Sequence, residues 1–105
     1  MHYLFEVTAK PGYTIEQYAE AWERASQLIQ QAPGAQGTRL HRKIGDEHTA
    51  LAIATWENKA ARDASANQPP QQVQEIIQSQ AHFVEIHFIG EFDAPEWEVL
   101  PPGDC

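Results

Sequence analysis

The chain has 105 residues, of which 42% are hydrophobic, and a formal net charge of −8 at pH 7. This length provides room for one domain with a modest core and excludes a second domain. All seven basic residues lie at or before Arg62 and eight of the fifteen acids follow it, which makes nucleic acid and anionic membranes poor partners because both need a basic face.

The N-terminus does not have the pattern of a targeting segment. Residues 1–10, MHYLFEVTAK, lack the basic start and long apolar run of a signal peptide, and no part of the chain approaches the roughly 20 apolar residues of a membrane span. We therefore expect a cytoplasmic protein. Residues 2–9 instead alternate between two faces, one of which carries Tyr3, Phe5 and Val7, and this alternation predicts a strand.

A long helix is predicted after the break at residues 10–12. Thr14 and Gln17 form a capping box, in which each side chain satisfies a free backbone amide at the helix start. Pro33 and Gly34 end the helix. Its apolar residues recur every three or four positions and form one stripe that can lie on a sheet: Ile15, Tyr18, Trp22, Ala25, Ile29 and Ala32.

Two more strands are predicted over residues 36–44 and 48–56, joined by a short polar loop that suits an antiparallel hairpin. Asn58 can cap a short helix that runs to about Asn67. Two prolines then interrupt the helix, since a proline inside a helix costs about 3 kcal/mol.

Another helical segment covers residues 71–79, and a last strand covers residues 82–92. The helical segment has a narrow apolar stripe containing Val73. We interpret the glutamines around this stripe as a solvated face: Gln71, Gln72, Gln74, Gln78 and Gln80.

These elements predict one α+β domain over residues 1–92. The order is ferredoxin-like, βαββαβ, with a four-stranded antiparallel sheet and the helices on one face. The last strand is apolar on both faces, which a two-layer domain with one sheet face in water does not need. The sheet of an identical subunit is the simplest cover for the second face, so we expect a homodimer.

Residues 93–105 form a tail with three prolines and three large apolar side chains, those of Trp97, Val99 and Leu100. Because these side chains are unfavourable in water, we expect the tail to dock on the partner subunit. Its acids can then meet Arg39, Arg42 and Lys43 of the partner subunit. The only cysteine, Cys105, is the last residue, so no internal disulfide can form and a catalytic thiol is not expected.

Several short segments together have a familiar pattern. Residues 10–12 precede a helix that contains Trp22, the segment Ala32-Pro33-Gly34 is followed by Gly37 and Leu40-His41-Arg42, and residues 53–58 read Ile-Ala-Thr-Trp-Glu-Asn. Over about residues 1–92 the ensemble resembles the antibiotic biosynthesis monooxygenase family of dimeric α/β barrels. The resemblance implies a pocket between helices and sheet in each subunit and two sheets packed face to face. It also implies chemistry of the family's kinds, which include oxygenation of quinols and polyketide phenols without a cofactor, and haem degradation.

The resemblance carries over to few site positions. The polyketide-oxidising branch has an Asn on the third strand, a Trp at the end of that strand and a Tyr in the following helix. Trp56 matches the Trp, whereas Ala52 and Arg62 stand at the other two positions. None of the site positions of the haem-degrading branch matches. The corresponding positions in this chain are Phe5, about residue Ser65 and about residue Glu75. Trp56 is therefore a candidate catalytic residue, and its alternative role is that of a packing anchor.

His87 is the first candidate for a general base, because histidine titrates near neutral pH without tuning. It lies in an apolar strand, and Glu85 projects from the same face, so the two can form an oriented base. The alternative is a histidine held by hydrogen bonds in a packed interface. His41 on the second strand is the next candidate, for ligand binding.

No metal site is predicted. The second and fourth strands lie at opposite edges of a ferredoxin-like sheet, so His41 and His87 would be roughly 14 Å apart. His82 and His87 point to opposite faces of one strand. Metal ligands must instead converge within about 2.2 Å of one ion.

Tyr18 and Trp22 on the first helix face Tyr3 and Phe5 on the first strand, and these four rings can line an aromatic pocket. The alternative is that they simply fill the core. The leading interpretation is a monooxygenase without cofactor, acting on an aromatic, quinol or polyketide-like molecule. Such a substrate supplies the electrons, while the protein takes a proton, stabilises the anion and excludes water.

Two other functions remain open at this point. One is a non-catalytic dimer that binds a small hydrophobic ligand, which the missing Asn and Tyr positions favour. The other is an isomerase or lyase on the same scaffold, with a histidine as its base. The oxygenase interpretation places Phe5, Trp22, Trp56 and His87 around the pocket.

Overall fold

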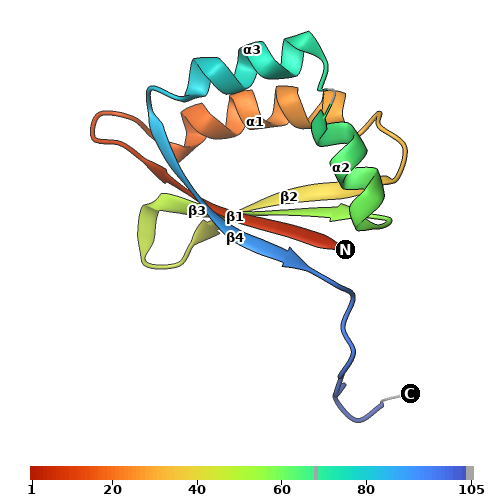
Figure 1. Ribbon diagram of the computed structural model, residues 1–105. Helices are drawn as coiled ribbons and strands as arrows, with labels where there is room; N and C mark the ends of the chain where they lie inside the picture. The colour runs from red at the N-terminus through yellow and green to blue at the C-terminus, as the bar shows by residue number, and fades with distance from the viewer. Residues whose placement is uncertain (68, 104–105) are drawn as a thin grey trace.

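The computed structural model describes residues 1–67 and 69–103. Its four strands form one antiparallel sheet in the order β2-β3-β1-β4, and the helices lie together on one face of that sheet (Figure 1). This confirms the predicted ferredoxin-like fold, with the second crossover divided into two helices. Among the described residues no helix is long and apolar enough to cross a membrane. The elements are β1 (His2–Ala9), α1 (Ile15–Ile29), β2 (Ala35–Lys43), β3 (Asp46–Trp56), α2 (Lys59–Asn67), α3 (Gln71–Gln80) and β4 (Val84–Phe92).

β1 lies between β3 and β4 and determines which side chains face the helices. Val7 is fully buried and clusters with Tyr18 of α1 and Val84 of β4. Because side chains alternate along a strand, Tyr3 and Phe5 face the helices together with Val7. The intervening residues of β1 face the other side of the sheet, as the alternation predicts.

Both predicted helix caps are present. The Thr14 hydroxyl accepts a hydrogen bond from the Gln17 amide at 3.2 Å, and the Gln17 side chain accepts one from the Thr14 amide at 2.9 Å. On α2, the Asn58 side chain accepts a hydrogen bond from the Ala61 amide at 2.8 Å. These bonds satisfy donors that have no partner inside the helix, so they fix where α1 and α2 begin.

Thr14→Ala is expected to lower the free energy of unfolding by about 1 kcal/mol, because it removes the acceptor of the Gln17 amide. Thr14→Ser keeps the hydroxyl and is expected to keep most of the stability. Urea unfolding followed by circular dichroism measures the difference. An unchanged midpoint for Thr14→Ala would show that the cap does not stabilise α1.

α1 ends three residues earlier than the apolar spacing predicts. The spacing extends to Ala32, but the last helical residue is Ile29. The Ala32 amide donates to the Ile29 carbonyl at 3.0 Å, a three-residue bond that tightens the chain into the next turn. Gly34 in that turn has a φ of 86°, and a Cβ there would collide with Ala61 of α2. The turn therefore requires a glycine at this position.

Three strands begin at different residues from those predicted, and β2 differs by one, beginning at Ala35 instead of residue 36. β3 begins at Asp46 instead of His48, since Lys43 and Asp46 already pair across the hairpin. The Asp46 carboxylate also accepts hydrogen bonds from the His48 amide and the Thr49 hydroxyl, at 3.0 and 2.7 Å. β4 begins at Val84 instead of residue 82, because residues 81–83 form the turn that follows α3.

A bulge in β4 changes which of its side chains face the helices. The register with β1 shifts between Leu4 and Phe5, which makes Ile89 an extra residue. Beyond the bulge Glu91 is opposite Tyr3, and its carboxylate lies 3.0 Å from the Lys59 ammonium of α2. The bulge therefore ties the end of the sheet to α2.

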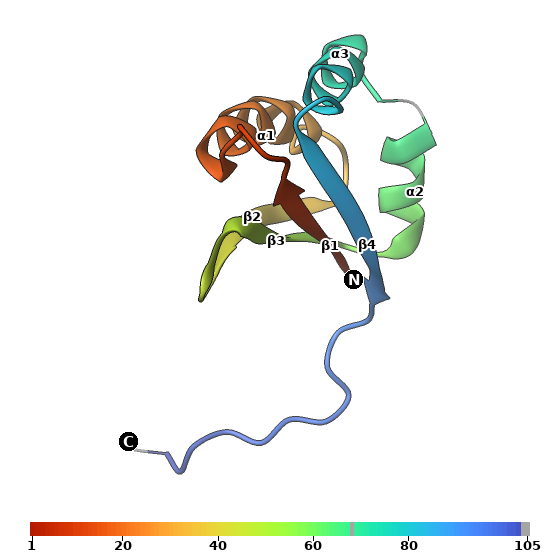
Figure 2. The same ribbon diagram turned by 90° about the vertical axis from the view of Figure 1, so that its left-hand side faces the viewer.

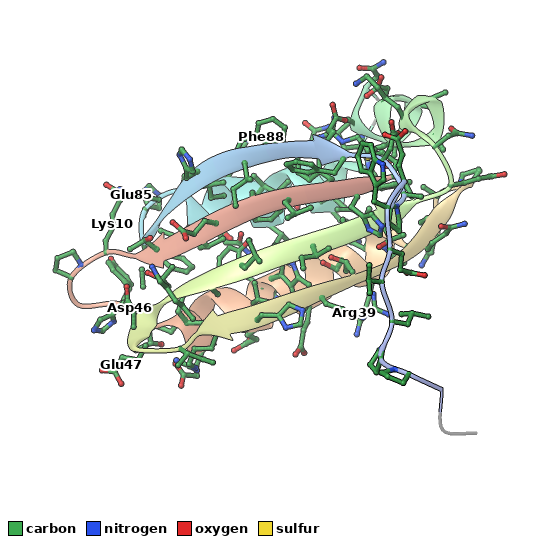
Figure 3. The ribbon with its side chains drawn as sticks, turned by 90° about the horizontal axis from the view of Figure 1, so that it is seen from below. Lys10, Arg39, Asp46, Glu47, Glu85 and Phe88 are labelled. Atoms are coloured by element: carbon green, nitrogen blue, oxygen red, sulfur yellow. The ribbon has the colours of Figure 1, made fainter. Side chains whose placement is uncertain are left out.

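The face of the sheet opposite the helices carries no helix (Figure 3). Leu4 and Ile53 are direct neighbours on this outer face, and Leu51 lies on it in the next row. All three side chains are only partly buried. Figure 3 looks onto the outer face, with Arg39 of β2 toward one edge of the sheet and Glu85 of β4 toward the other.

Residues 93–103 extend from the end of β4 on the side of the sheet away from the helices (Figures 1 and 2). Trp97, Val99 and Leu100 on this tail are largely exposed. Arg42, one of the basic residues expected to meet the tail, already pairs with Glu16 of the same chain at 2.9 Å. The prediction for Cys105 lies outside the described residues.

Candidate functional site

A cavity of about 350 Å³ lies between the helices and the sheet. This volume is at the lower end of the range, about 300 to 1,000 Å³, that small-molecule sites occupy. Ile77 of α3 and Ile86 of β4 line the cavity and are about half exposed, so the cavity opens to solvent between these two elements. Its lining is mainly apolar and includes Phe5, Trp22, Ile29, Ala54, Trp56 and Val73.

Five of the seven residues predicted for the site line this cavity: Tyr3, Phe5, Tyr18, Trp22 and Trp56. Their rings do not simply fill the core, because open volume remains between them. The Tyr3 ring contacts Phe5 edge-on, with centroids 5.9 Å apart, and packs against Phe88 at 5.0 Å. The site therefore has aromatic walls that suit a flat ring.

Trp56 is held in place by the N-terminus of the chain. It is the last residue of β3 and is buried. Its backbone amide donates to the Met1 carbonyl at 2.8 Å, and its carbonyl accepts a hydrogen bond from the N-terminal ammonium at 2.9 Å. These two bonds fix the backbone from which the Trp56 ring reaches the cavity.

His41 and His87 do not lie at the cavity. His87 pairs with Glu6 of β1, and His41 pairs with Leu51 of β3, which is itself opposite Glu6. Paired residues share a face of the sheet, so both histidines are on the outer face. Glu85 is on that face too, as predicted, but the expectation that either histidine lines the pocket is corrected: strand alternation points both of them away from it.

Tyr18 presents a neutral phenol to the cavity. The residue is 3% exposed, and burial raises the pKa of its phenol well above the usual value of about 10. The phenol therefore stays protonated at physiological pH. It can donate a hydrogen bond to a ligand, but it is not available as a base.

The raised pKa of Tyr18 predicts a loss of stability in alkali. The pKa of the Tyr18 phenol is higher in the folded protein than in the unfolded chain. The contribution of the protonated phenol to the free energy of unfolding is therefore complete below about pH 10 and is lost as the pH rises through the folded pKa. Tyr18→Phe has no phenol to ionise, so its stability is expected to fall less. Urea unfolding at about pH 8 and about pH 11 measures both losses, and equal losses would contradict the prediction.

The burial of Gln80 differs from the sequence prediction. The four other glutamines of this segment are exposed, as predicted, but Gln80 is only 5% exposed and lines the cavity. The prediction of a solvated side chain is therefore wrong for this residue. The helical spacing contained the signal, since Gln80 follows the buried Val73 by seven residues and so shares its helix face.

The antibiotic biosynthesis monooxygenase family model matches residues 1–87. The chain belongs to this family. No curated protein matches the sequence closely enough to count as a relative. The family assignment agrees with the resemblance that the short sequence segments indicate.

Solved structures share the fold at low sequence identity. SnoaB, a cofactor-independent oxygenase from Streptomyces nogalater, is 13% identical with a TM-score of 0.70, over 91% of this chain and 96% of SnoaB. PA3566 from Pseudomonas aeruginosa is 18% identical with a TM-score of 0.64, over 88% of this chain and 93% of its own. SO0527 from Shewanella oneidensis is 15% identical with a TM-score of 0.62, over 84% of this chain and 89% of its own.

Arg62 is the residue that the sequence resemblance matches to the tyrosine of the polyketide-oxidising branch. Its guanidinium carbon lies 4.2 Å from the centroid of the Tyr3 ring, a cation–π contact, and its side chain lines the cavity. The guanidinium is also 3.7 Å from the carboxylate of its neighbour Asp63. Ala52, which the same resemblance matches to the Asn of that branch, is buried and offers no polar group.

The charges around the cavity limit its chemistry. Among the described residues that line it, Arg62 alone carries a charge, and none is a histidine, an aspartate or a glutamate. A cation in an apolar site stabilises an anionic ligand, because the low dielectric strengthens the attraction. The arrangement can therefore bind a flat ring and stabilise its oxyanion, and it offers no conventional side-chain base.

Proposed function

We propose that this protein is a cofactor-independent monooxygenase that acts on an aromatic, quinol or polyketide-like small molecule. The observation that carries the proposal is the apolar cavity, open to solvent, in which Arg62 is the charged lining residue. Aromatic walls favour a flat substrate. A guanidinium favours the ionised form of a phenol or enol, which is the form that reacts with dioxygen.

Oxidation of an anthrone illustrates the proposed reaction. The anthrone loses a proton to water, and the enolate oxygen lies at Arg62. The enolate carbon adds dioxygen, and the resulting hydroperoxide loses water to give the quinone. One oxygen atom ends on that carbon, and the other leaves as water with the two hydrogens that the carbon held. The substrate supplies all the electrons, and the protein binds it, stabilises its anion and surrounds the reacting carbon with apolar walls.

A non-catalytic protein that binds a small hydrophobic ligand is the second candidate. Its support is that Ala52 and Arg62 replace two of the polar positions of the polyketide-oxidising branch. An isomerase or lyase with a histidine base has less support, because His41 and His87 face away from the cavity.

Oxygen uptake with a panel of quinols and anthrones separates these candidates. Ala54→Phe places a ring in the cavity from β3, and we expect it to abolish protein-dependent uptake. Ala60→Phe adds the same ring at an exposed position of α2 and is expected to have no effect. Uptake that survives Ala54→Phe would contradict the cavity as the site, and tight binding without uptake would favour the ligand-binding function.

We also infer that two copies pair through the outer face of the sheet. Leu4, Leu51 and Ile53 form the apolar centre of this face, and burying them favours association. The tail extends on the same side, which is where a partner would lie (Figure 2). Docking on that partner would cover Trp97 and Leu100, which the chain leaves exposed.

A further inference from the structure

Gln80 places an unsatisfied polar group beside an apolar cavity. Gln80 is 5% exposed, and its Nε2 is inaccessible to solvent and has no hydrogen-bond partner among the described residues. Buried polar groups in proteins are nearly always paired, because an unpaired one loses its hydrogen bonds to water without replacement. Because Gln80 also lines the cavity, a ligand there can supply the missing hydrogen bond once the carboxamide turns a polar atom toward it.

Gln80 and Arg62 lie toward opposite ends of the cavity. Arg62 contacts the ring of Tyr3 at the start of β1. Gln80 is next to the other end of that strand, because its carbonyl accepts a hydrogen bond from the Phe83 amide, and the Phe83 carbonyl accepts one from the Lys10 amide. Seven residues of a strand separate the backbones of Tyr3 and Lys10 by roughly 20 Å. In Figure 1, α2 and the junction of α3 with β4 are likewise at opposite ends of the molecule.

Side chains close part of this separation. Arg62 and Gln80 both reach into one continuous cavity, and the wall between them is mainly apolar. The cavity therefore has a cationic group toward one end, a neutral carboxamide toward the other and aromatic surface along its length. A carboxamide can present either its NH₂ or its oxygen to a ligand after a half-turn, so it can pair with a carbonyl or with a hydroxyl.

We propose that Gln80 determines substrate specificity by hydrogen bonding to a second oxygen of the ligand, at the end away from Arg62. The substrate class is then a flat, fused-ring aromatic with oxygen substituents at both ends, one ionisable and one neutral. This inference rests on the proposed function in so far as the ligand is the substrate of the oxygenase. A site built to hydrogen-bond an oxygen discriminates against an analogue that lacks it, because the carboxamide is then left unpaired.

Calorimetric titration without oxygen tests the inference with two probes of equal ring size. 2-Naphthol has one hydroxyl, and 2,6-dihydroxynaphthalene has a second one at the far end. We expect the wild type to bind the diol about tenfold more tightly than 2-naphthol. Gln80→Met, which keeps the length of the side chain but has no amide, is expected to bind both compounds within about twofold of each other. Gln78→Met, an exposed change on the same helix, is the matched control and is expected to keep the tenfold preference.

The unliganded proteins provide a second readout. If the Gln80 amide hydrogen-bonds only to a ligand, Gln80→Met is expected to raise the melting temperature of the unliganded protein. If the amide instead stabilises the fold, the same substitution is expected to lower it. Gln80→Leu repeats both measurements if the methionine variant does not fold. Equal affinity of the wild type for the two probes, a preference that persists in the Gln80 variants, or a lower melting temperature of those variants would overturn the inference.

Oxygen uptake, measured separately, distinguishes failure of this inference from failure of the proposed function. A Gln80-dependent preference for the diol in a protein that consumes no oxygen with any phenol or anthrone would refute the oxygenase and leave the specificity role intact. Normal uptake by both Gln80 variants together with an unchanged preference would refute the specificity role and leave the oxygenase intact.

Discussion

Ile53→Lys is expected to convert the proposed dimer into a monomer in solution. Ile53 lies on the outer face of the sheet, on β3, between Arg39 of β2 and Leu4 of β1. When a second sheet packs over this position, the lysine ammonium is buried beside an arginine and apolar side chains. Burying such a charge costs about 3 kcal/mol or more, which weakens pairing by a factor of about 100 or more.

Ile44→Lys is the matched control for this prediction. Ile44 is 99% exposed, just beyond the end of β2, and the same substitution there is expected to leave the dimer intact. Sedimentation velocity at several concentrations measures the dissociation constant of each variant. A monomeric wild type, or a dimeric Ile53→Lys, would show that the outer face is not the interface.

Removing residues 93–105 tests the docking of the tail by the same method. If the tail docks on the partner subunit, its removal is expected to weaken pairing. An unchanged dissociation constant would exclude docking of the tail.

Arg62→Gln is expected to lower kcat for an anthrone or a quinol by about 100-fold. The substitution removes the charged residue from the cavity lining, and losing one oriented group that stabilises an oxyanion typically costs a factor of 10² to 10³. The pH profile should change as well. The guanidinium favours the ionised substrate, so without it the activity is expected to rise only at higher pH.

Two further variants make the Arg62 prediction specific. Arg62→Lys keeps the charge and is expected to recover part of the lost activity. Arg24→Gln makes the same chemical change at an exposed position of α1 and is expected to leave kcat unchanged. Stopped-flow absorbance across a pH series measures all of them. If Arg62→Gln keeps both the wild-type kcat and the wild-type pH profile, Arg62 does not stabilise the reacting anion.

Most of the fold can be predicted from the sequence because its signals are local. Alternation in residues 2–9, the capping box at Thr14 and the prolines at 69 and 70 each determine an element over a few residues. The boundaries that differ depend on contacts between elements. The end of α1 is tightened by the turn at Gly34, which packs closely on α2, and the start of β3 is set by pairing with Lys43.

The site can be predicted from the sequence only in part. The aromatic residues of the cavity are predicted correctly because the apolar stripe of α1 and the alternation of β1 each identify one wall of the core. The structure places Tyr3 and Tyr18 in one cavity. His87 is misplaced because a strand with apolar residues on both faces does not reveal which face a given residue occupies. Only the pairing of His87 with Glu6 decides it.

The positions of Arg62 and Gln80 at the cavity cannot be predicted from local sequence patterns. Both are polar residues on helices of mixed composition, where a solvated position is the ordinary expectation. Their importance depends on a cavity that no local pattern reveals, since it is the volume that α1, α2, α3 and the sheet leave open together. Helical spacing from Val73 places Gln80 on the buried face, but it does not show that the face borders open space.

Isotope labelling during turnover of an anthrone tests the proposed oxygenase most directly. With ¹⁸O₂ in ordinary water, we predict that each quinone molecule gains one labelled oxygen, at the carbon that was oxidised, and that the other labelled atom appears in water. With ordinary O₂ in H₂¹⁸O and a short incubation, we predict an unlabelled product. Mass spectrometry distinguishes the two. A product oxygen that comes from water, or no protein-dependent product at all, would contradict a monooxygenase that works without a cofactor in the cavity that Arg62 lines.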